Sequence, residues 1–205
     1  MKKVETKRNG IYRFDDVLSE KTCKQIVDYI YKQTKNNKSN DLSKMPWEER
    51  DNIRWDKIDN DELYNKILEY RKTAAKLVSD SFGECVYPHF TDIVLWRAGR
   101  FMNEHIDDGS NIHFNDKNNL VLKEDLRYRI YTSVLYLNDD FKGGQTFVNS
   151  INGQYISEPK TGTIIFFKSS AENPHGVFKV ESGVRVTMPM WFTRELNQSE
   201  IYNVR

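Results

Sequence analysis

The segment Ile130-Tyr131-Thr132-Ser133-Val134-Leu135-Tyr136-Leu137-Asn138 decides the fold class. Aromatic and β-branched residues dominate it, and such residues favour a strand packed in a sheet. Other short segments of this kind fill the second half of the chain, and turn dipeptides such as Gly143-Gly144, Asn152-Gly153 and Ser182-Gly183 separate them. We therefore expect strands at 90–97, 100–106, 130–138, 145–149, 154–157, 163–167, 176–180 and 184–193.

The first part of the chain has the pattern of helices instead. Ser19 is a good N-cap, and apolar residues recur after it at helical spacing. A second helix is expected from about Asp61 to Phe82, where a glycine follows as a stop signal. Residues of about 32–60 are polar and predict a long loop that contains Trp47 and Trp55.

Two helices followed by about eight short strands indicate an α+β fold, with the N-terminal helices packed on one sheet of a double-sheet β-barrel. The 205 residues are expected to form a single domain. In this domain, residues 1–85 are the mainly helical support and residues 86–195 are the barrel core. Residues 108–127 form a polar insertion between two strands, which is typical of a lid.

The composition excludes several classes of function. A net charge of +1 creates no field that attracts nucleic acid or an anionic membrane, so neither is expected as a partner. No apolar segment is long enough to span a bilayer, and the basic start lacks the apolar stretch of a secretory signal. The two cysteines, Cys23 and Cys85, do not suggest a disulfide framework. We therefore expect a cytoplasmic protein.

His105-Ile106-Asp107 is the first motif that indicates chemistry. Alternate side chains of a strand share a face, so this imidazole and this carboxylate can reach one metal ion. His175 is the candidate third ligand, and two histidines with one carboxylate suit Fe(II), because co-substrate and O₂ need open coordination positions. The pattern alone is weak, because chance gives roughly 0.3 His-x-Asp occurrences in such a chain. A lone histidine is more often a surface or structural residue.

Arg185 stands ten positions after His175, across the Ser182-Gly183 turn. If 176–180 and 184–193 pair as strands, Arg185 returns towards the same end of the barrel as His175. A buried guanidinium there would bind a carboxylate with two hydrogen bonds. The alternative is an ordinary surface arginine at a strand edge.

The order of these motifs along the chain resembles that of a known family. The motifs are His105-Ile106-Asp107, the segment 131–138, Gly143-Gly144-Gln145-Thr146-Phe147, Pro159-Lys160-Thr161-Gly162, His175 and Gly183-Val184-Arg185. Over roughly residues 90–195 they resemble the prolyl hydroxylase group of 2-oxoglutarate/Fe(II)-dependent dioxygenases. Two segments are similar to the catalytic domain of the collagen prolyl 3-hydroxylases (leprecans), namely Ser169-Ser170-Ala171-Glu172-Asn173-Pro174-His175-Gly176-Val177 and Met190-Trp191-Phe192-Thr193.

The resemblance implies a double-stranded β-helix (a cupin-like jelly roll) as the core and four catalytic residues. Fe(II) is expected on His105, Asp107 and His175, and the far carboxylate of 2-oxoglutarate on Arg185. O₂ is then the second co-substrate, and ascorbate is a reductant. Four further residues are expected in the 2-oxoglutarate pocket, because they share a strand face or a motif with the residues named above: Tyr136, Thr146, Thr187 and Thr132.

The implied reaction is the hydroxylation of an unactivated C–H bond, and the leading substrate is a prolyl residue of a peptide or protein. A free amino acid or small metabolite is the alternative, since a fold does not fix the substrate. A remote alternative is a non-catalytic cupin-like binding protein, against which the four intact residues argue. Trp191 has two interpretations, packing between the sheets or lining the floor of the site. The oligomeric state stays open.

Overall fold

Capping residues define both helices of the computed structural model, which describes residues 2–4, 10–35, 45–46, 48, 51–109, 112–114, 120–122 and 126–200. Helix α1 (Glu20–Thr34) begins where Ser19 Oγ accepts a hydrogen bond from the N–H of Thr22 at 3.2 Å. Helix α2 (Asp61–Phe82) ends at Gly83, whose φ of 72° is left-handed and suits a residue without a side chain. Both helices confirm the prediction.

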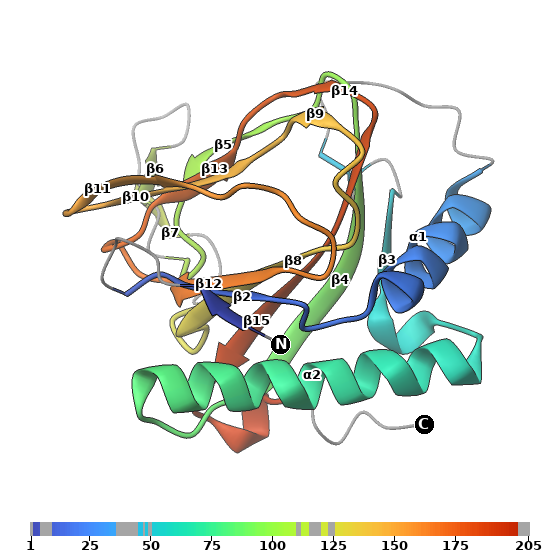
Figure 1. Cartoon of the computed structure of the whole chain (residues 1–205). Coiled ribbons are helices and arrows are strands. Elements are labelled where there is room, and N and C mark those ends of the chain that lie inside the picture. The colour runs from blue at the N-terminus through green and yellow to red at the C-terminus, as the bar shows by residue number, and fades with distance from the viewer. Residues whose placement is uncertain are drawn as a thin grey trace.

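Seven antiparallel strands form the main sheet, in the order β1-β2-β12-β8-β15-β4-β3 (Figure 1). Helix α2 runs along one side of this sheet, and the strands of the second sheet lie on its other side. The strands of the main sheet are β1 (Lys2–Val4), β2 (Tyr12–Asp15), β3 (Asn52–Arg54), β4 (Tyr87–Arg97), β8 (Tyr131–Tyr136), β12 (Ile164–Lys168) and β15 (Val184–Thr193).

Four strands form the minor sheet, in the order β11-β10-β13-β5. Two helices on one side of two facing antiparallel sheets make the expected α+β jelly roll. The strands of the minor sheet are β5 (Met102–His105), β10 (Thr146–Ser150), β11 (Gly153–Ile156) and β13 (His175–Val177). The smaller elements are β6 (Ile112–Phe114) paired with β7 (Leu120–Leu122), β9 (Lys142–Gly143) paired with β14 (Val180–Ser182), and the 3-10 turns Trp55–Lys57 and Leu196–Gln198.

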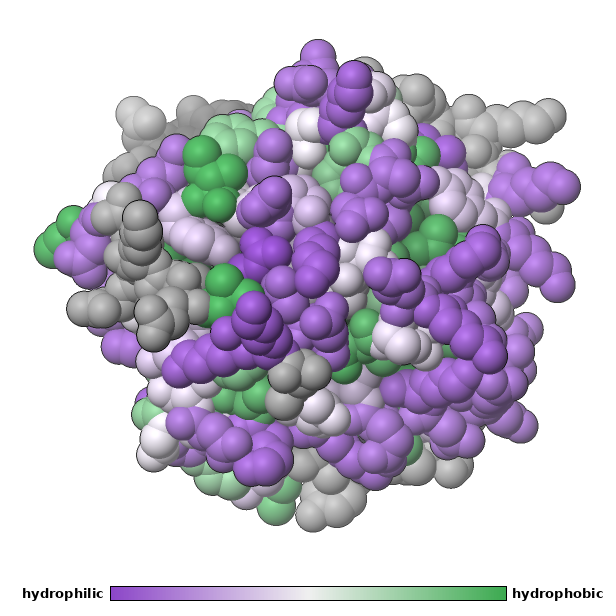
Figure 2. All heavy atoms as spheres, in the orientation of Figure 1, coloured by the Kyte–Doolittle hydropathy of each residue, from purple (hydrophilic) through white to green (hydrophobic). Residues whose placement is uncertain are grey.

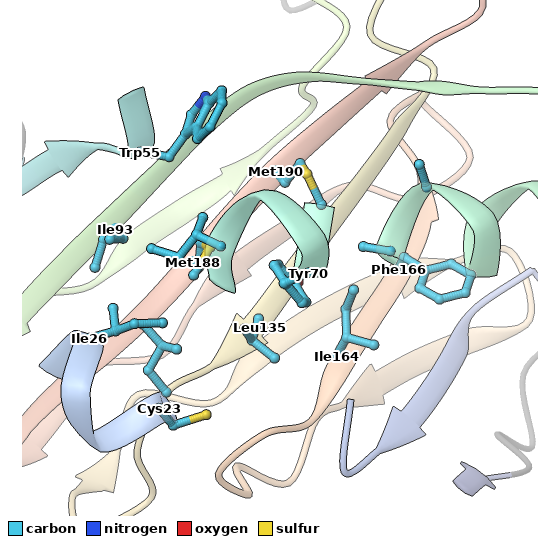
Figure 3. Packing of buried hydrophobic residues seen from close by; sticks show 14 of the residues in the cluster. Cys23, Ile26, Trp55, Tyr70, Ile93, Leu135, Ile164, Phe166, Met188 and Met190 are labelled. Atoms are coloured by element: carbon cyan, nitrogen blue, oxygen red, sulfur yellow. The ribbon is translucent and has the colours of Figure 1, made fainter. Parts of the chain in front are cut away.

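The largest hydrophobic cluster lies between the helices and the outer face of the main sheet (Figure 3). Tyr70 of α2 and Ile26 of α1 are buried in it, and alternate residues of the central strands meet them from the sheet. Because strand side chains alternate, the intervening residues must point to the inner face, between the two sheets. The sheet residues of the cluster include Leu135, Ile164, Phe166, Met188 and Met190.

The inner face carries two smaller apolar clusters. One contains Val134, Val148, Ile165 and Phe167 with Ile11. The other contains Val94, Trp96, Val177 and Val180. Both clusters join a strand of the main sheet to the minor sheet or its neighbouring strands, and so hold the two sheets together.

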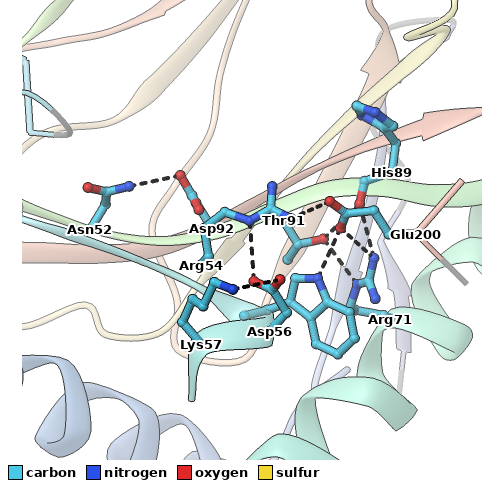
Figure 4. Close-up of polar contacts among 10 residues, drawn as sticks. Asn52, Arg54, Asp56, Lys57, Arg71, His89, Thr91, Asp92 and Glu200 are labelled. Atoms are coloured by element: carbon cyan, nitrogen blue, oxygen red, sulfur yellow. Dashed lines mark hydrogen bonds and ion pairs between the residues drawn. The ribbon is translucent and has the colours of Figure 1, made fainter. Parts of the chain in front are cut away.

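A buried polar network ties the end of the described chain to the helices (Figure 4). The Glu200 carboxylate accepts hydrogen bonds from Trp55 Nε1 at 2.9 Å and from Arg71 at 3.1 Å, and it also pairs with Arg54. The Arg71 guanidinium lies over the Trp55 ring, 3.8 Å from its centroid. Burial lowers the pKa of Arg71 to about 10, although the charge of Glu200 opposes this. The carboxylate therefore neutralises a cation that lies within the core.

The predicted pairing of 176–180 with 184–193 is wrong. In the structure β13 pairs with β10 and β5, β14 pairs with β9, and β15 pairs with β4 and β8. Gly183, with a φ of 78°, therefore does not close a hairpin but turns the chain from β14 into the main sheet. A Cβ on Gly183 would lie 3.0 Å from Asp140 O, so the close approach of this turn to the backbone at Asp140 requires glycine.

The expected loop at 32–60 is also wrong in part. Helix α1 extends to Thr34, β3 pairs with β4, and Trp55 is fully buried against Tyr64. The strands β1, β2, β3 and β9 were not predicted, because each is too short to show an alternating pattern. Trp47 and half of the expected lid at 108–127 lie outside the described residues.

The surface in Figure 2 is mainly hydrophilic, and its hydrophobic residues form small separate patches. Among the residues that the structure describes, no helix has both the length and the apolar character needed to cross a membrane.

Candidate metal centre and co-substrate pocket

Strand register brings the two candidate histidine ligands together. His105 ends β5 and His175 begins β13, and the two residues are direct partners across this antiparallel pair. Paired residues project from the same face of a sheet, and the ring centroids lie 4.4 Å apart. The His175 ring also packs edge-on against Phe167 of the main sheet, at 4.7 Å. Both imidazoles therefore lie between the sheets.

The third candidate ligand, Asp107, lies just beyond the end of β5. The N–H of Asp108 donates to Ser169 O at 3.3 Å and holds this turn against the main sheet. Asp107 Oδ1 is 3.4 Å from His105 Nε2, and Oδ2 is 3.1 Å from His175 Nε2. The candidate ligand atoms of the three residues all lie within 4.8 Å of one another, as one metal ion requires.

The outer nitrogens of both rings are occupied by backbone carbonyls. His105 Nδ1 lies 2.9 Å from Asn103 O, and His175 Nδ1 lies 3.2 Å from Asn173 O. A carbonyl only accepts, so each Nδ1 carries a proton, and in the neutral ring Nε2 presents a lone pair to the Asp107 carboxylate. With the rings neutral, the two Nε2 atoms and the carboxylate converge on one point, where a single cation can bind all three. This arrangement fits a divalent metal.

The charges of the centre favour a cation as well. Burial raises the pKa of Asp107, but the two imidazoles outweigh this and hold the pKa well below its ordinary value. Burial lowers the pKa of His105, but the neighbouring carboxylate outweighs this and raises the pKa overall. The carboxylate is therefore ionised and is balanced by positive charge.

Arg185 forms a second buried centre on the inner face of β15. Its side chain is 1% exposed, and it donates to Thr187 Oγ1 at 3.2 Å and to Thr146 Oγ1 at 3.0 Å. The Tyr136 hydroxyl donates to the same Thr146 oxygen at 3.0 Å. Burial lowers the pKa of Arg185, although Tyr136 opposes this. Nε has no hydrogen-bond partner, and within the described residues no carboxylate pairs with this guanidinium.

One face of β8 connects the two centres. Thr132, Val134 and Tyr136 share this face, and Thr132 donates to Asp107 Oδ2 at 2.7 Å, whereas Tyr136 contacts the arginine pocket. Four residues of a strand span about 13 Å. Apolar Val134 lies between the two residues on this face, which therefore has a metal-binding end and a cationic end.

All eight predicted site residues therefore lie in two connected groups. The structure assembles His105, Asp107 and His175 in one group, and Tyr136, Thr146, Arg185 and Thr187 in the other. Thr132 was expected in the co-substrate pocket, but its hydroxyl contacts Asp107 instead. Sequence reasoning missed Ser169, whose hydroxyl contacts Thr132. The sequence offered one signal for Ser169, its position at the start of the leprecan-like segment 169–177, because a single buried serine produces no periodic pattern.

Aromatic and cationic groups lie beside the metal centre. Trp191 is the direct partner of Thr132 across β8 and β15, so its indole shares the inner face. Arg129 lies over the indole ring, 4.8 Å from its centroid, and Phe90 packs edge-on against it at 5.7 Å. Trp191 Nε1 and Arg129 Nε are buried and have no hydrogen-bond partner among the described residues. These unpaired donors mark a place for an acceptor-rich group.

The sequence pattern of the 2OG-Fe(II) oxygenase superfamily matches residues 85–193, which is more than half of the chain and contains both centres. The chain belongs to the 2OG-Fe(II) oxygenase superfamily. Membership explains both centres of this oxygenase, since Fe(II), 2-oxoglutarate and O₂ are the metal and co-substrates that the family implies.

Curated relatives of this oxygenase include prolyl 3-hydroxylases. Prolyl 3-hydroxylase 3 of Mus musculus is 42% identical over 76 residues, which are 36% of this chain and 10% of that protein. Prolyl 3-hydroxylase 1 of Gallus gallus is 35% identical over 109 residues, which are 51% of this chain and 15% of that protein. The chain thus matches only a small part of the length of these relatives.

Solved structures share the fold at low identity. A prolyl-4-hydroxylase of Pseudomonas putida superposes with a TM-score of 0.64 at 18% identity, covering 91% of this chain and 93% of that one. A prolyl hydroxylase of Trichoplax adhaerens, solved with a peptide fragment of the hypoxia inducible factor, superposes with a TM-score of 0.63 at 17% identity, covering 93% and 86%. At this identity the likeness establishes the jelly roll and the placement of its helices.

Proposed function

We propose that this oxygenase hydroxylates a prolyl residue in a peptide or protein, with iron on His105, Asp107 and His175 and the far carboxylate of 2-oxoglutarate on Arg185. One observation carries the proposal. A metal-binding cluster and a buried arginine, which has no counter-ion among the described residues, lie at opposite ends of one strand face. A ligand that is both a metal chelator and an anion satisfies both ends.

The residues of the chain have distinct tasks in this reaction. When bound, Fe(II), 2-oxoglutarate and O₂ together supply the oxidant for a C–H bond, and 2-oxoglutarate leaves as succinate and CO₂. The carbonyls of Asn103 and Asn173 accept from the Nδ1–H of each ring, which orients both Nε2 atoms towards the metal position. Arg185 fixes the orientation of the co-substrate, and the apolar clusters on either side keep water out. Ascorbate is the proposed reductant of the iron.

The groups beside the metal centre support a peptide substrate. Trp191 and Arg129 offer buried N–H groups without acceptors, and peptide carbonyls are acceptors. The names of the similar curated proteins, prolyl 3-hydroxylases, agree with a prolyl ring as the group that is oxidised. A single domain over residues 1–205, with support from 1–85 and the jelly roll in 86–195, is proposed to carry the whole activity.

A free amino acid or small metabolite is the second candidate substrate. Arg129 has no carboxylate partner within the described residues, and a cation beside the metal centre is suited to the carboxylate of a small substrate. Mass spectrometry separates the candidates: proline-rich peptides and free amino acids are offered in turn, and a gain of one oxygen is sought. Exclusive oxidation of a free amino acid would overturn the peptide proposal.

The metal and co-substrate proposal has a direct spectroscopic test. Anaerobic addition of Fe(II) and 2-oxoglutarate should give a weak visible charge-transfer band, which is absent in His175→Ala. The matched control is His89→Ala, because His89 lies outside the cluster of metal ligands. If the wild-type protein gives no band, and no candidate substrate causes succinate release, the chain is a non-catalytic binding protein.

A further inference from the structure

We propose that Thr132 and Ser169 are positioning residues that hold the carboxylate of Asp107 in place for the metal. Ser169 Oγ lies 2.8 Å from Thr132 Oγ1, which lies 2.7 Å from Asp107 Oδ2. Both hydroxyl residues are buried, with exposed fractions of 0% and 2%. The inference rests on the proposed function, since it assumes that Asp107 is a metal ligand.

The direction of this chain of hydrogen bonds follows from the charges. A carboxylate that binds a metal is ionised and only accepts hydrogen bonds, and the Thr132 hydroxyl donates to Asp107 Oδ2 at 2.7 Å. The one proton of the Thr132 hydroxyl is therefore directed at Asp107. Thr132 must then accept from Ser169, which makes Ser169 the donor of the pair. Each hydrogen bond polarises the next, so the relay strengthens the bond that reaches the charged oxygen.

The backbone holds both hydroxyls rigidly. Thr132 lies in β8, the central strand of the main sheet, and it pairs with Phe167 of β12. Ser169 follows β12 directly, and its N–H donates to Ile130 O at 3.0 Å. The relay is thus built from two neighbouring strands of the main sheet, whereas both histidines belong to the minor sheet.

Asp107 needs such support because it lies outside the strand ladder. The strand β5 ends at His105, so no ladder hydrogen bond holds the backbone of Asp107. Thr132 distinguishes the two carboxylate oxygens, because it binds Oδ2 and leaves Oδ1 without a hydroxyl donor. The relay therefore sets the orientation of the one ligand that carries a full negative charge.

An ordinary buried hydrogen bond would look similar, so the test must separate positioning from stability. Thr132→Val keeps the shape and removes the donor, and we expect it to weaken Co(II) binding roughly 10- to 100-fold. Thr132→Ser restores the donor and should bind Co(II) within a few-fold of the wild-type protein. Ser169→Ala removes only the donor to Thr132, so its affinity for Co(II) should lie between those of Thr132→Val and Thr132→Ser. Titration calorimetry gives the affinities, and the visible spectrum of bound Co(II) reports a change in ligand geometry.

Ser133→Ala is the matched control. Ser133 is the neighbour of Thr132 on β8, it is equally buried, and its hydroxyl donates to Met190 O at 3.2 Å on the outer face. It should lose a similar amount of stability without a change in Co(II) affinity or spectrum. Thermal melting of the metal-free variants measures the stability.

Each outcome has one meaning. If Thr132→Val binds Co(II) as tightly as the wild-type protein, with an unchanged spectrum, the relay does not position Asp107. If Thr132→Val does not fold, Ser169→Ala decides, because equal Co(II) affinity in that variant would equally overturn the relay. If the wild-type protein itself binds no Co(II), the proposed metal centre fails, and this result is distinct from a failure of the relay alone.

Discussion

Arg185→Met tests the co-substrate pocket most sharply, because it should have opposite effects on binding and on stability. The guanidinium is buried and donates to two threonine hydroxyls, yet no carboxylate pairs with it in the described chain. Removing one partner of a buried charge pair costs about 3–5 kcal/mol. The affinity for 2-oxoglutarate should therefore fall by roughly 150- to 5,000-fold.

The ligand-free protein should respond differently. A methionine fills a similar volume without charge, so the variant no longer carries an unpaired buried cation. We expect its melting temperature without 2-oxoglutarate to equal or exceed that of the wild-type protein. Arg185→Lys keeps the positive charge but loses the planar guanidinium, so its affinity for 2-oxoglutarate should lie between those of the wild-type protein and Arg185→Met.

The assay is a calorimetric titration of the Mn(II)-loaded protein with 2-oxoglutarate, together with thermal melts. Arg194→Met is the control, since Arg194 follows the same strand but is exposed and pairs with Glu84. It should leave the affinity unchanged. If Arg185→Met binds 2-oxoglutarate within tenfold of the wild-type protein, Arg185 does not hold its carboxylate.

Two further predictions concern the polar network that joins the helices to the main sheet. Glu200→Gln should lower the free energy of unfolding by about 3 kcal/mol or more, because it leaves the buried Arg71 cation without its carboxylate. Thermal melting measures this loss, and Glu195→Gln is the control because Glu195 is exposed. Burial raises the pKa of Asp92 from 3.8 to about 6, so ionisation costs stability as the pH rises through this range, and the cost is complete above pH 6. Asp92→Asn keeps an acceptor for Asn52 and removes this cost, so it should stabilise the protein by up to about 3 kcal/mol at pH 7.5 and by little at pH 4. Urea unfolding at the two pH values measures the difference, and an equal effect at both would contradict the prediction.

Local patterns were sufficient for the helices and for most strands. The Ser19 cap and the glycine after Phe82 act within one helical turn, so their meaning does not depend on the rest of the chain. The alternation within β8 likewise predicted that Thr132 and Tyr136 share a face. The strand partners could not be predicted, because pairing depends on contacts between segments that are far apart in sequence.

The placement of Arg185 illustrates this limit. Its approach to the site was expected from a hairpin with 176–180, but β15 belongs to the opposite sheet and reaches the same space from the other side. Arg185 does lie buried on the inner face of β15, but the strand pairing expected to place it there was wrong, since a glycine turn in a sequence does not reveal whether the chain reverses or changes sheets.

The sequence by itself determined which residue types are present for chemistry: two histidines and an aspartate for a metal, and an arginine for a carboxylate. It also determined that Thr132 and Tyr136 share a strand face, because side-chain direction follows from a period of two, but Asp107 lies beyond the end of β5, so this period did not decide its direction. Only the tertiary structure decided the hydrogen-bond partners. Asp107 meets Thr132 across 25 positions of sequence, and Arg185 has no counter-ion in the part of the chain that the structure describes; both facts depend on how the two sheets pack face to face.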